Sequence, residues 1–232
     1  MTWLWLALAC AFLAALADAL SKRHLTGYTA REMAMVRFGV GGLLLLPFAF
    51  AHPLADLPWP FWVWMAALIP LEVAAVVLYM RAIRDHPLAL TLPYLAFTPV
   101  FTTVTGYVLL GETVSPRGLA GILLVVAGAW LLNLEAGGAL EPLRAIARQR
   151  GARLMLAVAG IYSVSAVLGK GALAYMPAAA FGPFYFALLG IATLAVFGLG
   201  NRGALRALAR KPGWHLAIGA TMAAMAVTHF LA

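Results

Sequence analysis

The chain has 232 residues, of which 64% are apolar and 10% are charged, and its formal net charge is +8. A mean hydropathy of +0.94 excludes an ordinary soluble domain, because one core could not bury that much apolar surface. The single cysteine, Cys10, excludes an internal disulfide and a cysteine metal cluster. We therefore expect an all-α integral membrane protein.

Apolar runs of about 20 residues predict eight membrane-spanning helices, because a helix of that length crosses roughly 30 Å of hydrocarbon. The strands of a membrane barrel would be half as long and would alternate in polarity. The first run lacks a basic segment before it and an obvious cleavage site, so we interpret it as a retained span. The expected spans are residues 3–21, 33–51, 59–83, 88–110, 117–133, 153–175, 178–199 and 213–231.

A basic linker, residues 135–152, separates the fifth span from the sixth. It begins with Gly137 and Gly138 and continues to Glu141 and Pro142, a pair that suits the start of a short surface helix. A solvated charged loop is the alternative that we favour. In either case the linker divides the chain into residues 1–134 and 153–232.

The two parts contain segments that read as distant copies of each other. ADALSKRHL, residues 17–25, aligns with SAVLGKGAL, residues 165–173, and this alignment pairs Lys22 with Lys170. The same spacing pairs Phe38 and Gly42 with Phe186 and Gly190. Since five helices per repeat is an odd number, the repeats must insert in opposite orientations, as in many secondary transporters. We predict a ten-helix design of two inverted five-helix repeats, with the second repeat incomplete after about three helices.

Loop charges give an orientation, because cytoplasmic loops are enriched in lysine and arginine. One side of the predicted membrane carries only Arg117, so the other side is expected to be cytoplasmic, together with the linker, and the N-terminus outside. We expect a plasma membrane, such as the bacterial inner membrane. Topology and anionic lipid account for the charge without a nucleic acid. The basic side carries Arg81, Arg84, Arg144, Arg148, Arg150, Arg153, Arg202, Arg206, Arg210 and Lys211.

Glu72 is the first candidate for a functional residue inside the membrane. It lies near the middle of the third span, two residues after Pro70, whose ring and missing N–H loosen the preceding turn. An ionisable group at a helix centre costs about 2.5–3.5 kcal/mol on insertion scales, so such groups are functional candidates. Glu72 is a candidate for proton coupling, and a protonated or lysine-paired glutamate that only fixes helix packing is the alternative.

Asp18 and Lys22 are four residues apart and should share one face of the first helix. They either neutralise each other or open to bind a solute, and Lys22 could instead snorkel to the headgroups. Lys170 has no acid at the matching position, so we expect its partner to be a substrate or Glu72. Arg37 either lines the same cavity or snorkels to the interface, and we favour snorkelling.

Several further side chains are candidates for the substrate pathway. Tyr79, Tyr162 and His229 could offer hydrogen bonds from within apolar helices, although aromatic residues at helical spacing more often serve packing. Pro93 and Pro99 interrupt the fourth span, where nearby threonines could satisfy the freed carbonyl groups. We interpret Pro70, Pro93 and Pro99 as helix breaks with a gating role. Glu112 ends the span and is interpreted as a cap or an interfacial ion rather than a ligand.

The stretch from residue 82 to residue 132 resembles the EamA-type module of the drug/metabolite transporter superfamily. It reads AIRDHPLALTLPYLAFTPVFTTVTGYVLLGETVSPRGLAGILLVVAGAWLL. The similar features are the proline-valine-phenylalanine stretch, the leucine-glycine-glutamate ending and the glycine-rich fifth helix. This resemblance implies ten helices in two inverted repeats, a central cavity and movement of a small metabolite by alternating access.

The leading hypothesis is a secondary-active exporter or exchanger of small polar metabolites such as amino acids, with protons as a candidate coupling ion. Glu72 would lie near the cavity centre, with Lys22 and Lys170 toward opposite mouths. A non-transporting scaffold or half-transporter is the first alternative. A membrane enzyme is a weaker one, because no nucleophile with its base, paired carboxylates or metal set stands out. We expect no cofactor and no metal, and a homodimer is an open alternative for the assembly.

Overall fold

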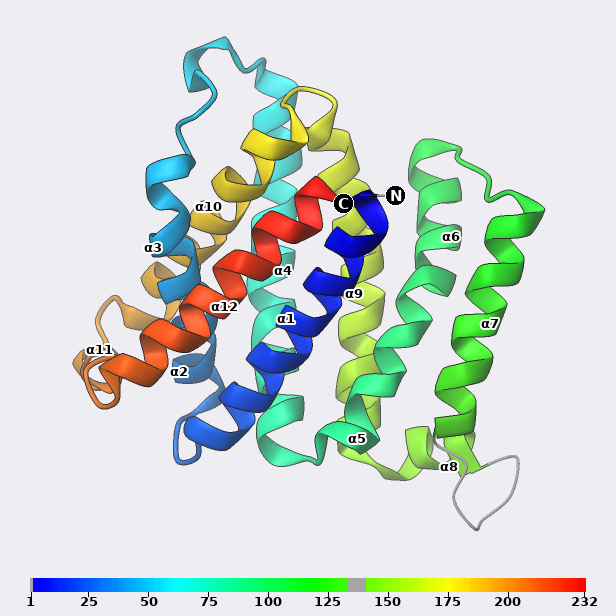
Figure 1. Ribbon diagram of the computed structural model, residues 1–232, viewed down its shortest axis with the longest axis horizontal. Helices are drawn as coiled ribbons and strands as arrows, with labels where there is room; N and C mark the ends of the chain where they lie inside the picture. Colours follow the sequence, from blue (N-terminus) through cyan, green and yellow to red (C-terminus); the bar gives the residue numbers. More distant parts are fainter. Residues whose placement is uncertain (1, 133–140) are drawn as a thin grey trace. The chain divides into compact units, whose positions relative to one another are not determined.

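The computed structural model describes residues 2–132 and 141–232, and these residues fold into helices joined by short connections (Figure 1). Six helical segments are long and apolar enough to cross a membrane. They are α1 (Thr2–His24), α4 (Trp59–Asp85), the segment Leu88–Leu110, α9 (Arg150–Leu173), α10 (Ala178–Gly198) and α12 (Pro212–Leu231). A shorter apolar helix, α7 (Pro116–Leu132), follows the third of these. The chain is therefore a polytopic helical membrane protein.

The second predicted span is also helical, but its helix changes type along its length. It runs through α2 (Ala30–Ala34), the π-helix η1 (Met35–Val40), α3 (Gly41–Leu45) and the 3-10 turn η2 (Leu46–Phe48). A short 3-10 turn, η3 (Leu54–Asp56), precedes α4. All eight predicted spans thus correspond to helical segments.

The linker contains a helix, α8 (Glu141–Arg148), so the favoured interpretation of this segment as a loop is wrong. The helix begins where Glu141 and Pro142 suit a first turn, because proline lacks only an N–H that the first turn leaves unpaired. Gly137 and Gly138 lie outside the described residues. A second short helix, α11 (Arg202–Ala207), connects α10 to α12, and the side chain of Asn201 caps its start.

The helices form two compact units, and each unit draws on both sides of the linker. Unit 1 comprises Met1–Val73 and Gly171–Ala232, and unit 2 comprises Ala74–Lys170. In unit 1, α1 and α12 run side by side in opposite directions (Figure 1). Close contacts hold both ends of this pair, since Cys10 Sγ lies 4.0 Å from His229 Nδ1 and the His24 ring stacks on Trp214 at 3.5 Å. The second span packs against both α10 and α12.

The contact between α3 and α10 has no room for side chains. A Cβ atom added at Gly42 would lie 2.5 Å from the Phe186 carbonyl oxygen and 2.8 Å from the Gly190 Cα atom. A Cβ atom added at Gly190 would lie 2.7 Å from the Phe38 carbonyl oxygen and 2.8 Å from the Gly42 Cα atom. Each glycine therefore faces the other glycine and the carbonyl group four residues before it. This is the reciprocal pattern of a two-fold related interface. Glycine permits this approach, as it does in other membrane helix pairs.

Two tryptophans extend the reciprocal pattern within unit 1. Trp214, near the start of α12, stacks on His24 at the end of α1. Trp64, near the start of α4, lies where a Cβ atom at Gly171 would meet its ring at 2.8 Å, and Gly171 lies near the end of α9. The two aligned segments, residues 17–25 and 165–173, thus each contact a tryptophan near their ends.

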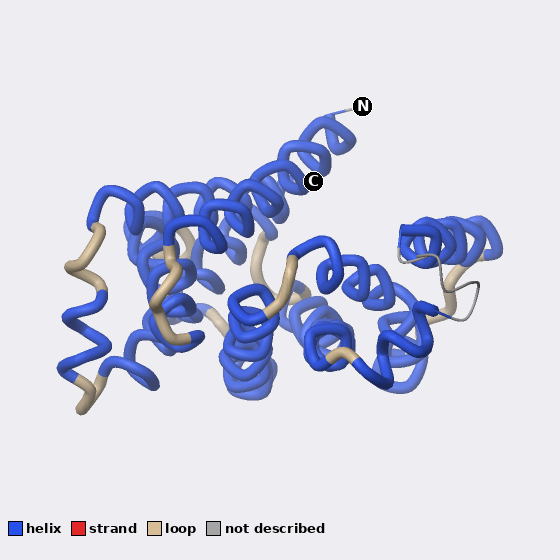
Figure 2. Tube along the Cα trace, turned by 90° about the horizontal axis from the view of Figure 1, so that it is seen from below, coloured by secondary structure: helices blue, strands red, loops and turns tan. Residues whose placement is uncertain are grey.

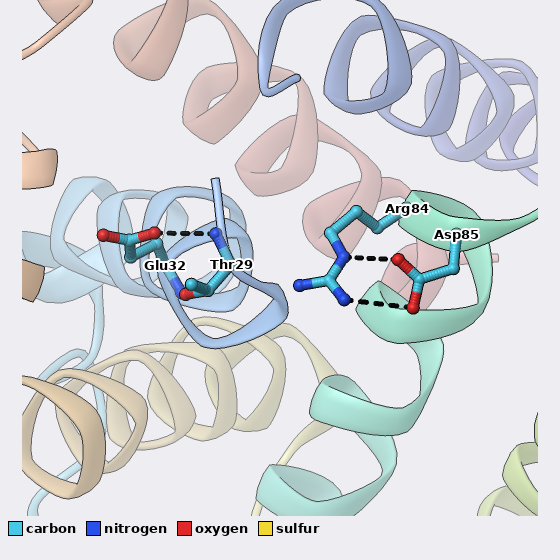
Figure 3. Close-up of polar contacts among 4 residues, drawn as sticks. All are labelled: Thr29, Glu32, Arg84 and Asp85. Carbon is cyan, nitrogen blue, oxygen red and sulfur yellow. Dashed lines mark hydrogen bonds and ion pairs between the residues drawn. The ribbon is translucent and has the colours of Figure 1, made fainter. Parts of the chain in front are cut away.

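Local polar contacts fix two helix ends (Figure 3). At the start of α2, the Thr29 N–H donates to Glu32 Oε2 at 2.7 Å, and the Glu32 N–H donates to the Thr29 hydroxyl at 3.2 Å. This capping box satisfies two N–H groups that the first turn leaves unpaired. At the end of α4, the Arg84 guanidinium donates to both carboxylate oxygens of Asp85, at 2.6 and 3.0 Å.

Unit 2 contains the rest of α4, then α5 (Leu88–Thr91), the 3-10 helix η4 (Leu92–Phe97), α6 (Thr98–Leu110), α7, α8 and most of α9. Figure 2 shows the described residues as helices joined by loops and turns. The Thr105 hydroxyl of α6 lies 3.2 Å from the Ser163 carbonyl oxygen of α9. A Cβ atom added at Gly151, at the start of α9, would lie 2.7 Å from both His86 and Thr91. The start of α9 therefore packs against the segment that leads into α6, and the middle of α9 packs against α6 itself.

The α3–α10 crossing predicts a strong effect of adding one methyl group. Gly42→Ala and Gly190→Ala should each lower the free energy of unfolding by about 1–3 kcal/mol, because the clash is with backbone atoms that cannot rotate away. Thermal unfolding in detergent measures the effect. Gly160→Ala is the matched control, since a Cβ atom there meets nothing within 4 Å and alanine favours the helix. Equal midpoints for Gly42→Ala and Gly160→Ala would refute the close approach.

Candidate functional site

A pocket of about 500 Å³ lies in unit 2, between α6, α9 and the start of α7. Its wall on α6 carries the hydroxyl side chains of Thr98, Thr102 and Thr103 together with Pro99. The remaining wall is mostly apolar. At its rim are two oppositely charged residues, Lys170 and Glu112.

Prolines shape the helix that carries these threonines. Pro93 lies in the first turn of the 3-10 helix η4 and Pro99 in the first turn of α6, where the span changes helix type, and their gating role stays a prediction. Pro99 cannot donate a hydrogen bond to the Leu95 carbonyl group. The Thr98 N–H donates to this carbonyl instead, in a tighter 3-10 turn. Pro70 differs, because α4 continues through it as a helix.

The threonine hydroxyls do not bond the carbonyl groups that the prolines free, so that part of the prediction is wrong. The Thr102 hydroxyl donates to the Thr98 carbonyl oxygen at 2.9 Å, and the Thr103 hydroxyl donates to the Pro99 carbonyl oxygen at 2.9 Å. These are ordinary bonds to the carbonyl four residues earlier. Each hydroxyl oxygen keeps lone pairs that can accept a hydrogen bond.

Gly111 places Glu112 at the pocket rim. Gly111 has φ of 68°, a left-handed conformation that favours glycine, and it ends α6. The Gly111 N–H donates to the Tyr107 carbonyl oxygen, and the Glu112 N–H donates to the Gly106 carbonyl oxygen. The bond from Gly111 is that of the αL capping motif, in which a left-handed glycine closes the helix and fixes the direction of the next residue. The leucine-glycine-glutamate string thus turns the chain and presents a carboxylate.

Lys170 Nζ lies 2.6 Å from Glu112 Oε2, and the two side chains are 60% and 48% exposed. The expectation that Lys170 pairs with Glu72 is therefore wrong, because Lys170 forms its ion pair with Glu112 of the same unit. An ion pair this exposed contributes only about 0–1 kcal/mol. A ligand that carries both charges could replace either partner at little cost.

Unit 1 holds a different ion pair, buried between α1 and the second span. Asp18 accepts a hydrogen bond from Arg37 Nη1, and their side chains are 6% and 4% exposed. Arg37 Nε also lies 3.5 Å from Met222 Sδ of α12. The preference for snorkelling of Arg37 is therefore wrong, since this side chain is directed inward. Asp18 thus has a partner on another helix that the sequence did not predict. Lys22 is half-buried one turn further along α1, and its pairing with Asp18 stays a prediction.

The remaining candidates do not line the pocket of unit 2. Glu72 is buried in the part of α4 that belongs to unit 1. Tyr79 is buried and Tyr162 is half-buried in unit 2, and both lie outside the pocket lining. His229 is exposed in unit 1, beside Cys10. Their role in a substrate pathway stays a prediction. Among the described residues, no three His, Cys, Asp or Glu side chains gather as metal ligands.

The buried pair predicts a double-mutant cycle. Asp18→Leu or Arg37→Met alone should lower the free energy of unfolding by about 3–5 kcal/mol, because each removes one charge of a buried ion pair and leaves the other charge buried. The double variant Asp18→Leu with Arg37→Met should cost less than either single change. Thermal unfolding in detergent measures all three variants. Additive losses would show that the two residues do not depend on each other.

The comparisons with known proteins identify the family. The model of the EamA-like transporter family matches residues 1–134, which is more than half of the chain. None of the curated proteins and none of the solved structures matches the chain. The matched residues include Asp18, Arg37, Glu72 and Glu112, and end before Lys170. The chain therefore belongs to the EamA-like transporter family, within the drug/metabolite transporter superfamily, and is a membrane transporter of that type.

Proposed function

We propose that the chain carries small zwitterionic metabolites, amino acids among them, as an exporter or exchanger that works by alternating access. The pocket of unit 2 supports this proposal, because its rim places an ammonium group 2.6 Å from a carboxylate. A zwitterion can bind its carboxylate to Lys170 and its ammonium group to Glu112. The threonine hydroxyls offer further acceptors, and the apolar wall suits a short apolar side chain.

The exposed ion pair suits transport better than tight binding. In the empty pocket Lys170 and Glu112 satisfy each other, so neither charge is left without a partner when the ligand leaves. When a zwitterion enters, it exchanges one ion pair for two. A transported solute must bind the inward and outward states differently to bias their equilibrium, and breaking this pair in one state would supply such a difference.

The reciprocal crossing in unit 1 supports an architecture of two inverted repeats. On this proposal residues 1–134 and 153–232 form the repeats, and the two transporter states exchange the roles of their helices. Glu72 is the proposed proton-coupling group, since it is a buried carboxyl within a span. The loop charges favour a plasma membrane, such as the bacterial inner membrane, with the N-terminus outside and the linker inside.

Removing either charge at the rim should weaken ligand binding. Lys170→Met and Glu112→Gln should each raise the dissociation constant of a bound amino acid about tenfold, since one charge-assisted hydrogen bond is lost. Isothermal titration with a panel of amino acids in detergent measures this change. Arg84→Met and Asp85→Asn are the matched controls, because they break an exposed ion pair outside the pocket lining. If they weaken binding equally, the pocket is not the site.

Glu72 gives a separate test of coupling. Glu72→Gln should abolish exchange driven by a pH gradient in proteoliposomes, because the amide cannot take up a proton, while solute exchange without a gradient persists. Asp56→Asn, at an exposed carboxyl in the connection before α4, is the control and should leave coupling intact. Gradient-driven exchange that is unchanged in Glu72→Gln removes this residue from the mechanism.

A further inference from the structure

Cations gather at one end of unit 1 without carboxylate partners. They lie at the end of α1, at the start of α2 and in the connection from α10 to α12. All are exposed, and none forms an ion pair with a carboxylate of the described residues. The nearby Glu32 is buried and accepts the Thr29 N–H of the capping box. The cations are Arg23, Arg31, Arg202, Arg206, Arg210 and Lys211.

Two of these cations are held in place over one aromatic ring. The Arg210 guanidinium lies 5.4 Å and Lys211 Nζ lies 6.0 Å from the centre of the Tyr28 ring. Lys211 Nζ also donates to the His24 carbonyl oxygen at 2.8 Å. Two like charges on one ring repel each other, and an anion between them would relieve that repulsion.

A hydrogen bond to His215 holds the Tyr28 ring in place. His215 Nδ1 lies 2.8 Å from the Leu208 carbonyl oxygen, which can only accept, so Nδ1 carries the proton in the neutral ring. Nε2 then accepts from the Tyr28 hydroxyl at 3.1 Å. Burial raises the pKa of the Tyr28 phenol, so it keeps the proton that it donates. Hydrogen bonds through His215 therefore hold the Tyr28 ring under the two cations.

The surroundings of the two cations are apolar and lie at the level of a membrane surface. α1 ends at His24 and α12 begins at Pro212, so the cations mark the end of two adjacent spans. Trp214 stacks on His24 and is 45% exposed, and Leu205 of α11 and Leu216 of α12 are also exposed, at 48% and 54%. Tryptophan at a span end is typical of the headgroup region. The ligand that fits has an anionic head and an apolar body.

We propose that Arg210, Lys211 and Trp214 form a binding site for the headgroup of an anionic phospholipid. The two cations bind the lipid phosphate, and Trp214 contacts the glycerol and the upper acyl chains. A free phosphate would satisfy the cations and leave the apolar residues uncovered. The site lies in unit 1 and does not depend on the transported solute.

Native mass spectrometry of the delipidated protein in detergent tests the proposal, with dioleoyl phosphatidylglycerol as the probe and dioleoyl phosphatidylcholine as the neutral-headgroup comparison. We expect the phosphatidylglycerol to bind more tightly. The double variant Arg210→Gln with Lys211→Gln should weaken it about 30-fold, from the contribution of two basic residues near an anionic surface. The double variant Arg117→Gln with Arg153→Gln removes the same charge from unit 2 and should leave the affinity unchanged.

Three outcomes would overturn the proposal. The first is equal affinity for the two lipids, and the second is an equal loss in both double variants, which would indicate an effect of net charge alone. The third is displacement of the lipid by inorganic phosphate at equal concentration, which would indicate a free-anion site. All substituted side chains are exposed, and an unchanged thermal midpoint of each variant verifies that it is folded.

Discussion

The packing of unit 1 depends on the place where α3 and α10 meet backbone to backbone. In a bilayer the lipid is as apolar as the helix surface, so helices associate through close packing rather than through the hydrophobic effect. Gly42 and Gly190 remove the side chains at this crossing, and each lies where a Cβ atom would clash with the other helix. The crossing brings the second and seventh predicted spans together. The second span also packs against α12, the partner of α1, and it carries Arg37 of the buried Asp18–Arg37 pair.

The two ion pairs differ in their exposure to solvent, and this difference determines what each can do. Asp18 and Arg37 are almost fully buried, so neither charge can be separated from the other without a large cost. Lys170 and Glu112 are about half exposed, and water screens their attraction. The first pair is suited to holding helices in register, and the second to exchanging partners with a solute. The π-helix that carries Arg37 is consistent with a specialised position, since such segments often occur at functional sites.

Much of the fold could be predicted from the sequence, because apolar runs of membrane length determine where spans lie. All eight predicted spans correspond to helical segments, and six of these segments are long and apolar enough to cross a membrane. Pairings between helices could not be predicted. The rule for residues four apart finds Lys22 as a partner of Asp18, but it cannot find Arg37, which lies on another helix, in a π-helical segment that the sequence does not signal. Glu112 was interpreted as a cap or an interfacial ion because its contact with Lys170 forms only when α6 and α9 pack.

The helix in the linker shows the limit of composition as a guide. Charged residues favour a solvated loop on average, yet Glu141 and Pro142 form a local start signal that the chain follows. The matched glycines could not be interpreted from the sequence alone. Gly42 and Gly190 were weak signals in a chain with 22 glycines, and only their reciprocal contact gives them structural meaning.

We propose that the transported solute carries both charges, one that binds Lys170 and one that binds Glu112. Counterflow into proteoliposomes tests it most directly, with one amino acid loaded inside and three labelled solutes offered outside. These are the same amino acid, its decarboxylated amine and its deaminated acid. We expect the labelled amino acid to accumulate inside the proteoliposomes, and little or none of either singly charged analogue to do so. Equal accumulation of the amine or of the acid would contradict it.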